Sequence, residues 1–107
     1  MRSAGIWALM GWLEGMSVSI VIPSILRQYT GGEGVVKIAL NSGIIYSVGD
    51  CLNELAERFP GVGQKLCDAQ GNVAGYVHLF VDGRKVTAGD TLQDRDELII
   101  MLAVGGG

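Results

Sequence analysis

The feature that most restricts the fold is the last apolar run of the chain, Glu97–Val104, with the sequence ELIIMLAV. Every residue after the glutamate is apolar, and a strand that is apolar on both faces is typical of the centre of a sheet. The run passes directly into three glycines, Gly105, Gly106 and Gly107. Glycine loses more conformational freedom on folding than any other residue, so a glycine run is a poor way to end a strand. The sequence therefore predicts a rigidly held central strand followed by a flexible glycine tail, residues 105–107.

Earlier segments of the chain also have strand patterns. They are rich in β-branched residues or alternate between apolar and polar positions, and Asp82-Gly83 is a tight-turn signal between two of them. Strands are expected over Val18–Ile22, Val35–Leu40, residues 76–81 and Lys85–Thr87. The polar segment GDTLQDRDE is expected to be a connection with Leu92 tucked into the core.

One segment has a strong helical pattern, SVGDCLNELAERFPG. Its apolar residues recur at spacings of three and four and form one stripe: Val48, Leu52, Leu55, Ala56 and Phe59. Pro60 and Gly61 are expected to stop this helix. The residues after them, VGQKLCDAQGN, are predicted to be a loop with room for one short helical turn.

The order of these elements predicts an α+β fold. One helix would cross one face of a mixed sheet of four or five strands, and the last strand would pair with the distant first strand. This is the β-grasp (ubiquitin-like) arrangement. We assign residues 17–104 to the β-grasp domain and residues 105–107 to the tail.

The N-terminal segment, residues 1–16, is an extension of uncertain status. Its apolar run from Ile6 to Leu13 is interrupted by Gly11 and followed by Glu14, and no cleavage site resembling that of a secretory signal follows. The run is also far shorter than the roughly 20 apolar residues that span a bilayer. Two interpretations remain: translation starts at Met16, or the segment forms a short accessory helix.

Composition excludes several classes of function. The net charge is −3 and there is no basic cluster, so neither nucleic acid nor a membrane surface is expected as a partner. Cys51, Cys67 and the single histidine, His78, are too few and too far apart for a zinc site. Both cysteines are expected to be buried free thiols. Nothing indicates an oxidising compartment, so a cytoplasmic location is expected.

The chain also has no recognisable catalytic group. His78 has no visible partner, and Asp94 and Asp96 are typical of a solvated loop. The glycine-rich stretches GVGQKL and GGEG match no complete nucleotide-binding motif and are read as turns. An enzyme acting alone, a metal site and a bound cofactor are therefore not expected.

The sheet face opposite the helix is predicted to keep an apolar patch. If the alternate residues Val77, Leu79 and Val81 face the helix, Phe80, Ile99 and Met101 lie on the other side together with Lys37 and His78. Apolar patches on such a face often mark a protein contact. Phe80, Ile99 and Met101 are therefore our hypothesis for a docking face. The alternative is that residues 1–15 fold over the patch, since Trp7 and Trp12 also need burial.

These segments resemble the ubiquitin-like sulfur-carrier proteins. The resemblance rests on VSIVIPSILRQYTGGEGVVKI, LFVDGRKV and LQDRDELIIMLAVGGG and covers residues 17–107. The family includes the small subunit of molybdopterin synthase, the thiamin sulfur carrier and the mycobacterial-type carrier that supplies sulfur for cysteine. The opening IPSILRQYTGG looks most like the cysteine-pathway type.

The resemblance implies a chemical role for the chain terminus. An activating enzyme would use ATP to adenylate the C-terminal carboxylate, and sulfur would displace AMP. The resulting thiocarboxylate would donate sulfur to an acceptor or synthase enzyme. Gly107 would carry the group, or Gly106 if the chain is trimmed, with Gly105 and Gly106 as the flexible lead. The carrier is then a protein co-substrate, and the ATP belongs to its partner.

The sequence departs from the family pattern at three places. Leu102 stands where the family usually has a proline, and there are three terminal glycines instead of two. Arg95 replaces the glycine of a common turn, which costs little if its φ is negative. Three alternatives stay open: the small subunit of molybdopterin synthase, a ubiquitin-like modifier that forms isopeptide bonds, and a β-grasp binding module with an inert tail.

Overall fold

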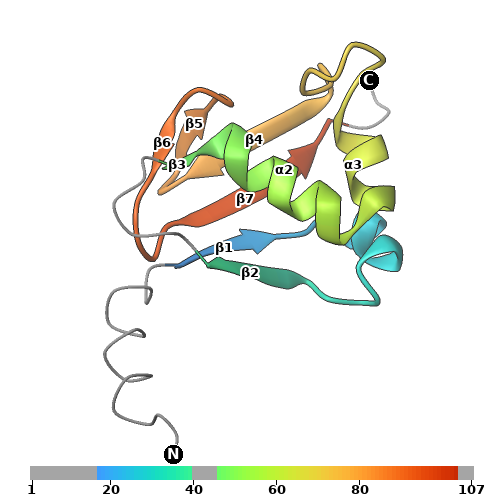
Figure 1. The fold of residues 1–107 in the computed structure, drawn as a ribbon, viewed down its shortest axis with the longest axis horizontal. Coiled ribbons are helices and arrows are strands. Elements are labelled where there is room, and N and C mark those ends of the chain that lie inside the picture. Colours follow the sequence, from blue (N-terminus) through green and yellow to red (C-terminus); the bar gives the residue numbers. More distant parts are fainter. Residues whose placement is uncertain (1–16, 40–45, 104–107) are drawn as a thin grey trace, which may run out of the picture.

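The computed structural model describes residues 17–39 and 46–103, which form a mixed sheet with helices packed on one face (Figure 1). The predictions for residues 1–16, for Val104 and for the glycines 105–107 fall outside the described residues. None of the helices in the described part of the chain is long and apolar enough to cross a bilayer.

The main sheet has five strands in the order β2-β1-β7-β4-β5. Their bounds are β1 Ser17–Val21, β2 Val35–Ala39, β4 Val77–Val81, β5 Arg84–Val86 and β7 Glu97–Leu102. β1 pairs in parallel with β7, and the other neighbours are antiparallel. The last strand is therefore central and pairs with the first, which confirms the predicted β-grasp arrangement.

Two short strands were not predicted. β3 (Tyr46–Ser47) and β6 (Thr91–Leu92) form a separate two-stranded sheet, with Tyr46 opposite Leu92. Leu92 is buried, as the sequence predicts for the otherwise polar connection.

The main helix, α2, covers Val48–Arg58 and lies across the sheet (Figure 1). Ser47 and Asp50 form a capping box at its start, in which each side chain accepts a hydrogen bond from the other residue's backbone N–H, at 3.0 and 3.1 Å. At its last residue, Arg58 donates a hydrogen bond of 3.0 Å to the carbonyl oxygen of Lys37 in β2. The helix is thus fixed at both ends.

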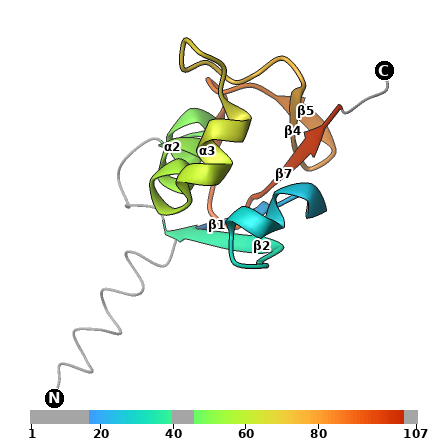
Figure 2. The same cartoon turned by 90° about the vertical axis from the view of Figure 1, so that its right-hand side faces the viewer.

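The prediction that Pro60 and Gly61 end helical structure was only half right. α2 does stop at Arg58, but Pro60 is the first residue of a second helix, α3 (Pro60–Leu66), longer than the single turn allowed for. Proline suits that position because its missing N–H would have no intrahelical partner there. α2 and α3 lie side by side on one face of the sheet (Figure 2). A 3₁₀ helix, η1 (Ser24–Tyr29), was also missed.

The predicted alternation of the strands is confirmed. The side chains expected to face the helix are all buried: Val36, Ile38, Val77, Leu79, Val81, Leu98 and Ile100. Lys37, Phe80, Ile99 and Met101 lie at alternate positions on the same strands and are exposed or half-buried. The sheet therefore has one face in the core and one face turned away from the helices.

One expectation about a single residue was wrong, and one stated condition is not met. Cys51 is fully buried, but Cys67 is exposed because α3 ends at Leu66, which takes the buried position. Arg95 would replace a turn glycine at little cost only if its φ were negative, but its φ is +71°. An L-residue adopts this left-handed conformation at some energetic cost.

Candidate functional site

The predicted attachment point leaves the domain at the end of β7, and that end is firmly held. Leu102 pairs with Val77 of β4. The next residue, Ala103, donates its backbone N–H to the carbonyl oxygen of Tyr76 at 2.8 Å. The residues that follow therefore start from a fixed point on a central strand. The predicted attachment residues Gly106 and Gly107 lie outside the described residues.

The first surface beside this point is the face of the sheet turned away from the helices. Phe80 lies opposite Ile99, and Ile99 also lies next to Val21, which is opposite Val35. Met101 lies two residues further along β7 and is 53% exposed. The structure thus brings the predicted Phe80, Ile99 and Met101 together. Sequence reasoning missed that Val21 and Val35 extend the same apolar row, because it had not fixed the register of β1 and β2.

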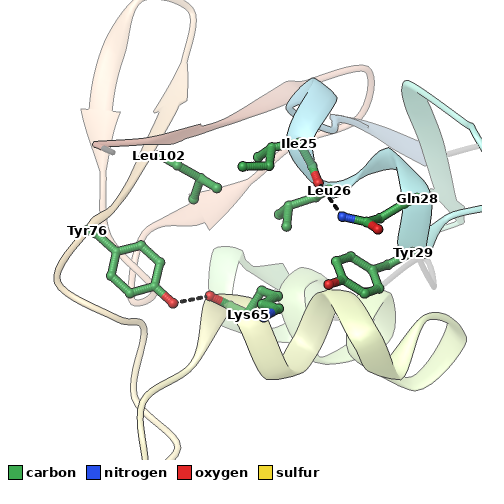
Figure 3. Close-up of a pocket in the computed structure, with 7 residues that line it drawn as sticks. All are labelled: Ile25, Leu26, Gln28, Tyr29, Lys65, Tyr76 and Leu102. Atoms are coloured by element: carbon green, nitrogen blue, oxygen red, sulfur yellow. Dashed lines mark hydrogen bonds between the residues drawn. The ribbon is translucent and has the colours of Figure 1, made fainter. Parts of the chain in front are cut away.

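The second surface is a groove of about 260 Å³ on the other side of the end of β7, called here the tyrosine groove (Figure 3). Its lining side chains come from η1, α3, the residue just before β4 and the end of β7: Ile25, Leu26, Gln28, Tyr29, Lys65, Tyr76 and Leu102. It was not predicted, since four segments far apart in the sequence build it and none of them has a motif.

Hydrogen bonds and close packing fix the walls of the tyrosine groove. The Tyr76 hydroxyl donates to the carbonyl oxygen of Lys65 at 2.5 Å (Figure 3). The Lys65 ammonium lies 5.9 Å from the centre of the Tyr29 ring, within range of a cation–π contact. A Cβ at Gly61 would come within 2.6 Å of Cδ1 of Tyr29. A glycine at position 61 therefore lets α3 approach Tyr29 closely enough to form the groove.

The thiol of Cys51 is not suited to carry sulfur. Burial, with a smaller effect of Glu54, raises the pKa of Cys51 from 9.0 to about 12, so the thiol stays protonated near neutral pH. Nucleophilic and sulfur-transfer chemistry needs the thiolate. In the described ranges, no group of three or more His, Cys, Asp or Glu residues could hold a metal ion. The buried Cys51 is therefore a packing residue of the core.

A model of the ThiS family matches residues 20–107 of the chain, which is most of its length and includes the glycines. The chain belongs to the ThiS family. It is 28% identical over 98 residues to the sulfur carrier protein CysO of Mycobacterium tuberculosis, an alignment that covers 86% of this chain and the whole of that protein.

Solved structures agree with this assignment. The crystal structure of M. tuberculosis CysO has a TM-score of 0.66 and 28% identity over 81% of this chain and 99% of that one. CysO of Amycolatopsis orientalis, solved in a complex with BexX, has a TM-score of 0.71 and 28% identity over 84% and 99% of the two chains. The modifier protein SAMP1 of Haloferax volcanii has a TM-score of 0.76 but only 21% identity over 85% and 99%, and that likeness shows the fold alone.

The family membership settles the broad class of the protein. It is a ubiquitin-like sulfur carrier with a β-grasp fold. Sulfur carriers of the CysO and ThiS type are small protein substrates and not enzymes, in agreement with the lack of any catalytic motif in the sequence.

Proposed function

We propose that the C-terminal glycine carboxylate of this protein carries sulfur as a thiocarboxylate. The carboxylate oxygen attacks the α-phosphorus of ATP in an activating enzyme, and pyrophosphate leaves. A sulfide-equivalent nucleophile then attacks the carbonyl carbon of the acyl-adenylate, a C–S bond forms, and AMP leaves with the C–O bond electrons. The resulting thiocarboxylate donates its sulfur to a biosynthetic acceptor.

The observation that carries this proposal is the way β7 is held in the sheet, by β1 as far as Ile99 and by β4 as far as Leu102. β7 pairs with β1 and with β4, and the Ala103–Tyr76 hydrogen bond extends the pairing beyond Leu102. A chain terminus that starts from such a fixed base can be presented to a second protein in a reproducible direction. The sequence VGGG that follows has no side chain larger than valine. Such a segment fits a narrow channel and tolerates many backbone conformations.

The terminal residue of this segment is the expected site of modification. Gly107 would carry the adenylate and then the thiocarboxylate, with Gly105 and Gly106 as the lead, unless trimming exposes Gly106. The matching relatives are named CysO, which favours an acceptor in the biosynthesis of cysteine or another sulfur-containing metabolite. We place this chemistry in the cytoplasm, where ATP and biosynthetic enzymes are available.

We also propose that Phe80, Ile99 and Met101 form the docking face for the activating enzyme. Support comes from their position on β7, the strand that leads into the tail, and on its neighbour β4, and from the continuous apolar row toward Val21 and Val35. An apolar patch of this kind on a sheet face is typical of a protein contact.

Intact-protein mass spectrometry with C-terminal peptide mapping tests the proposal. The protein is purified from its own host, and is also incubated with ATP, sulfide and host extract. We expect a fraction heavier by the mass difference between sulfur and oxygen, located on the last glycine. A chain that stays unmodified under both conditions would contradict the carrier function. Lysine-linked conjugates of higher mass, without a thiocarboxylate, would instead identify a modifier.

A further inference from the structure

The tyrosine groove lies close to the place where the proposed chemistry happens. Leu102 lines it, and Gly107, the proposed attachment residue, is five positions after Leu102. A fully extended chain spans at most about 3.3–3.6 Å per residue, so five residues reach about 17 Å. Any enzyme that holds the terminal carboxylate in its nucleotide site must therefore cover surface near this groove.

The groove is exposed and apolar. Ile25 is 56% exposed and Tyr76 is 45% exposed, and they are two of the four large apolar side chains that are exposed among the described residues. A third, Met101, adjoins Leu102 on the opposite side of β7. Exposed apolar side chains thus surround the end of β7.

The walls of the groove are already formed in the free protein. The Tyr76 hydroxyl holds the Lys65 carbonyl, and the Gln28 side chain donates to the Ile25 carbonyl at 3.2 Å (Figure 3). The Ala103–Tyr76 hydrogen bond fixes Leu102 against the same wall. A preformed groove adds affinity because little ordering is needed when a partner binds.

The chemistry of the lining defines the side chains that would fit. Three of the lining side chains are aliphatic, Ile25, Leu26 and Leu102, and they suit an apolar side chain. Of the seven lining residues, Lys65 is the charged one, and its ammonium lies near the Tyr29 ring. A carboxylate is the complementary group for this position. The groove therefore fits an apolar residue beside an aspartate or glutamate.

The activating enzyme has a particular need for such a contact. At that step the terminus is a plain carboxylate after glycines, which differs little from the terminus of other chains. Selectivity for this chain must come from interactions with the folded domain. An enzyme that accepts the thiocarboxylate can recognise the sulfur itself.

We propose that the tyrosine groove receives an apolar side chain flanked by a carboxylate from the activating enzyme, as a second contact beside the sheet face. This inference rests on the proposed function, because it assumes that the chain terminus is activated by another protein.

The test measures ATP-pyrophosphate exchange by the adenylating enzyme of the same host, with the full-length carrier as the varied substrate. Lys65→Glu places a negative charge opposite the expected carboxylate, and Ile25→Asp replaces an exposed apolar side chain of the lining with a charged one. We expect each to raise the KM for the carrier about tenfold, with kcat nearly unchanged, because the contact helps binding and does not touch the reacting atoms. Lys65→Arg keeps the charge and is expected to stay near the unmodified protein.

Lys37→Glu is the matched control. Lys37 is also exposed. It lies opposite Ser19 of β1, which in turn lies beside Glu97, the first residue of β7. The groove is at the other end of β7, at Leu102. We expect the enzyme's KM for Lys37→Glu to stay within about twofold of its KM for the unmodified carrier, since an isolated rim charge contributes little. Urea midpoints check that all variants are folded.

The outcomes separate the two proposals. If the unmodified carrier supports no exchange, the proposed function fails, and the groove has no activating enzyme to bind. If the unmodified carrier is activated and both Lys65→Glu and Ile25→Asp match Lys37→Glu, the groove lies outside the interface and this inference is wrong. A fall in kcat with unchanged KM would also overturn it.

Discussion

Phe80 and Ile99 lie directly opposite each other on β4 and β7, on the sheet face turned away from the helices. The same row continues through Val21 of β1 to Val35 at the edge of the sheet. An apolar row across four strands is unusual on a face that does not pack against the helices, since such faces normally alternate to polar residues. The row crosses β7, the strand that leads into the glycine tail, at Ile99, which is why we assign it to docking.

Replacing Phe80 with aspartate tests this docking face. The charge would be buried without a partner when the activating enzyme binds, so we expect at least about a tenfold loss in kcat/KM for activation. The free energy of unfolding should fall by only about 1 kcal/mol, the scale of a cross-strand pair, because Phe80 is half-buried. Pyrophosphate exchange and urea denaturation measure the two effects. Lys37→Asp, in the polar row of the same face, is the control, and unchanged activation of Phe80→Asp would exclude the docking face.

Replacing Gly63 with alanine tests the close contact between the two helices. A Cβ at position 63 would lie 2.6 Å from Cβ and 3.3 Å from Cα of Ala56 in α2, so α3 would have to move. Overpacking costs about 1–3 kcal/mol, and alanine regains about 1 kcal/mol of helix propensity. We expect a net loss of about 1 kcal/mol in the free energy of unfolding, measured by urea denaturation.

Gly89→Ala is the matched control for this substitution. A Cβ at position 89 meets nothing within 4 Å, and the backbone there is not left-handed. We expect its free energy of unfolding to stay within about 0.5 kcal/mol of the unmodified protein. If Gly63→Ala proves as stable as Gly89→Ala, the two helices do not depend on glycine for their approach.

The sheet could be predicted from the sequence because its pattern is strong. Alternation in Val77–Val81 fixes which side chains enter the core, and the unbroken apolar run 98–102 requires a central strand. The register between strands could not be predicted in this way. Alternation places Val21 and Val35 on a face but does not say that Val21 lies beside Ile99 or that Val35 lies beside Val21.

The second helix was missed for a physical reason. Two glycines in PGVGQKL disfavour a helix by about 1 kcal/mol each relative to alanine. Packing overrides this preference, since a Cβ at Gly61 or Gly63 would come within 2.6 Å of Tyr29 or Ala56, respectively. The tyrosine groove, one wall of which α3 forms, could not be predicted without that helix.

The buried thiol of Cys51 predicts a loss of stability at alkaline pH. Its pKa is 9.0 when exposed and about 12 in the folded protein. Below pH 9 both states keep the proton, so the group has no effect on stability. Between pH 9 and pH 12 the unfolded chain loses the proton while the folded protein keeps it. The free energy of unfolding should therefore fall by up to about 1 kcal/mol per pH unit in this window.

Cys51→Ala isolates this effect in urea denaturation under reducing conditions at pH 8, 9, 10 and 11. Tyr46 acts in the same direction above pH 10, because burial above all raises its pKa from the usual 10.0. The interval between pH 9 and pH 10 is therefore the diagnostic one. We expect a shallower decline for Cys51→Ala there. Parallel declines of the two proteins would show that the folded thiol titrates at its ordinary pKa.

Deleting Gly107 tests which glycine bears the activated group. If Gly107 is the site, the deletion draws the carboxylate back by one residue, up to about 3.6 Å. Misplacement of a reacting atom by about 1 Å can cost a hundredfold in rate. We therefore expect a fall of at least about tenfold in kcat for adenylation, with KM for the carrier nearly unchanged because the folded domain is intact. The measurement is pyrophosphate exchange, with Gly89→Ala as a control that leaves the tail unaltered. Full activity of the shortened chain would instead assign the site to Gly106 and indicate that Gly107 is removed before activation.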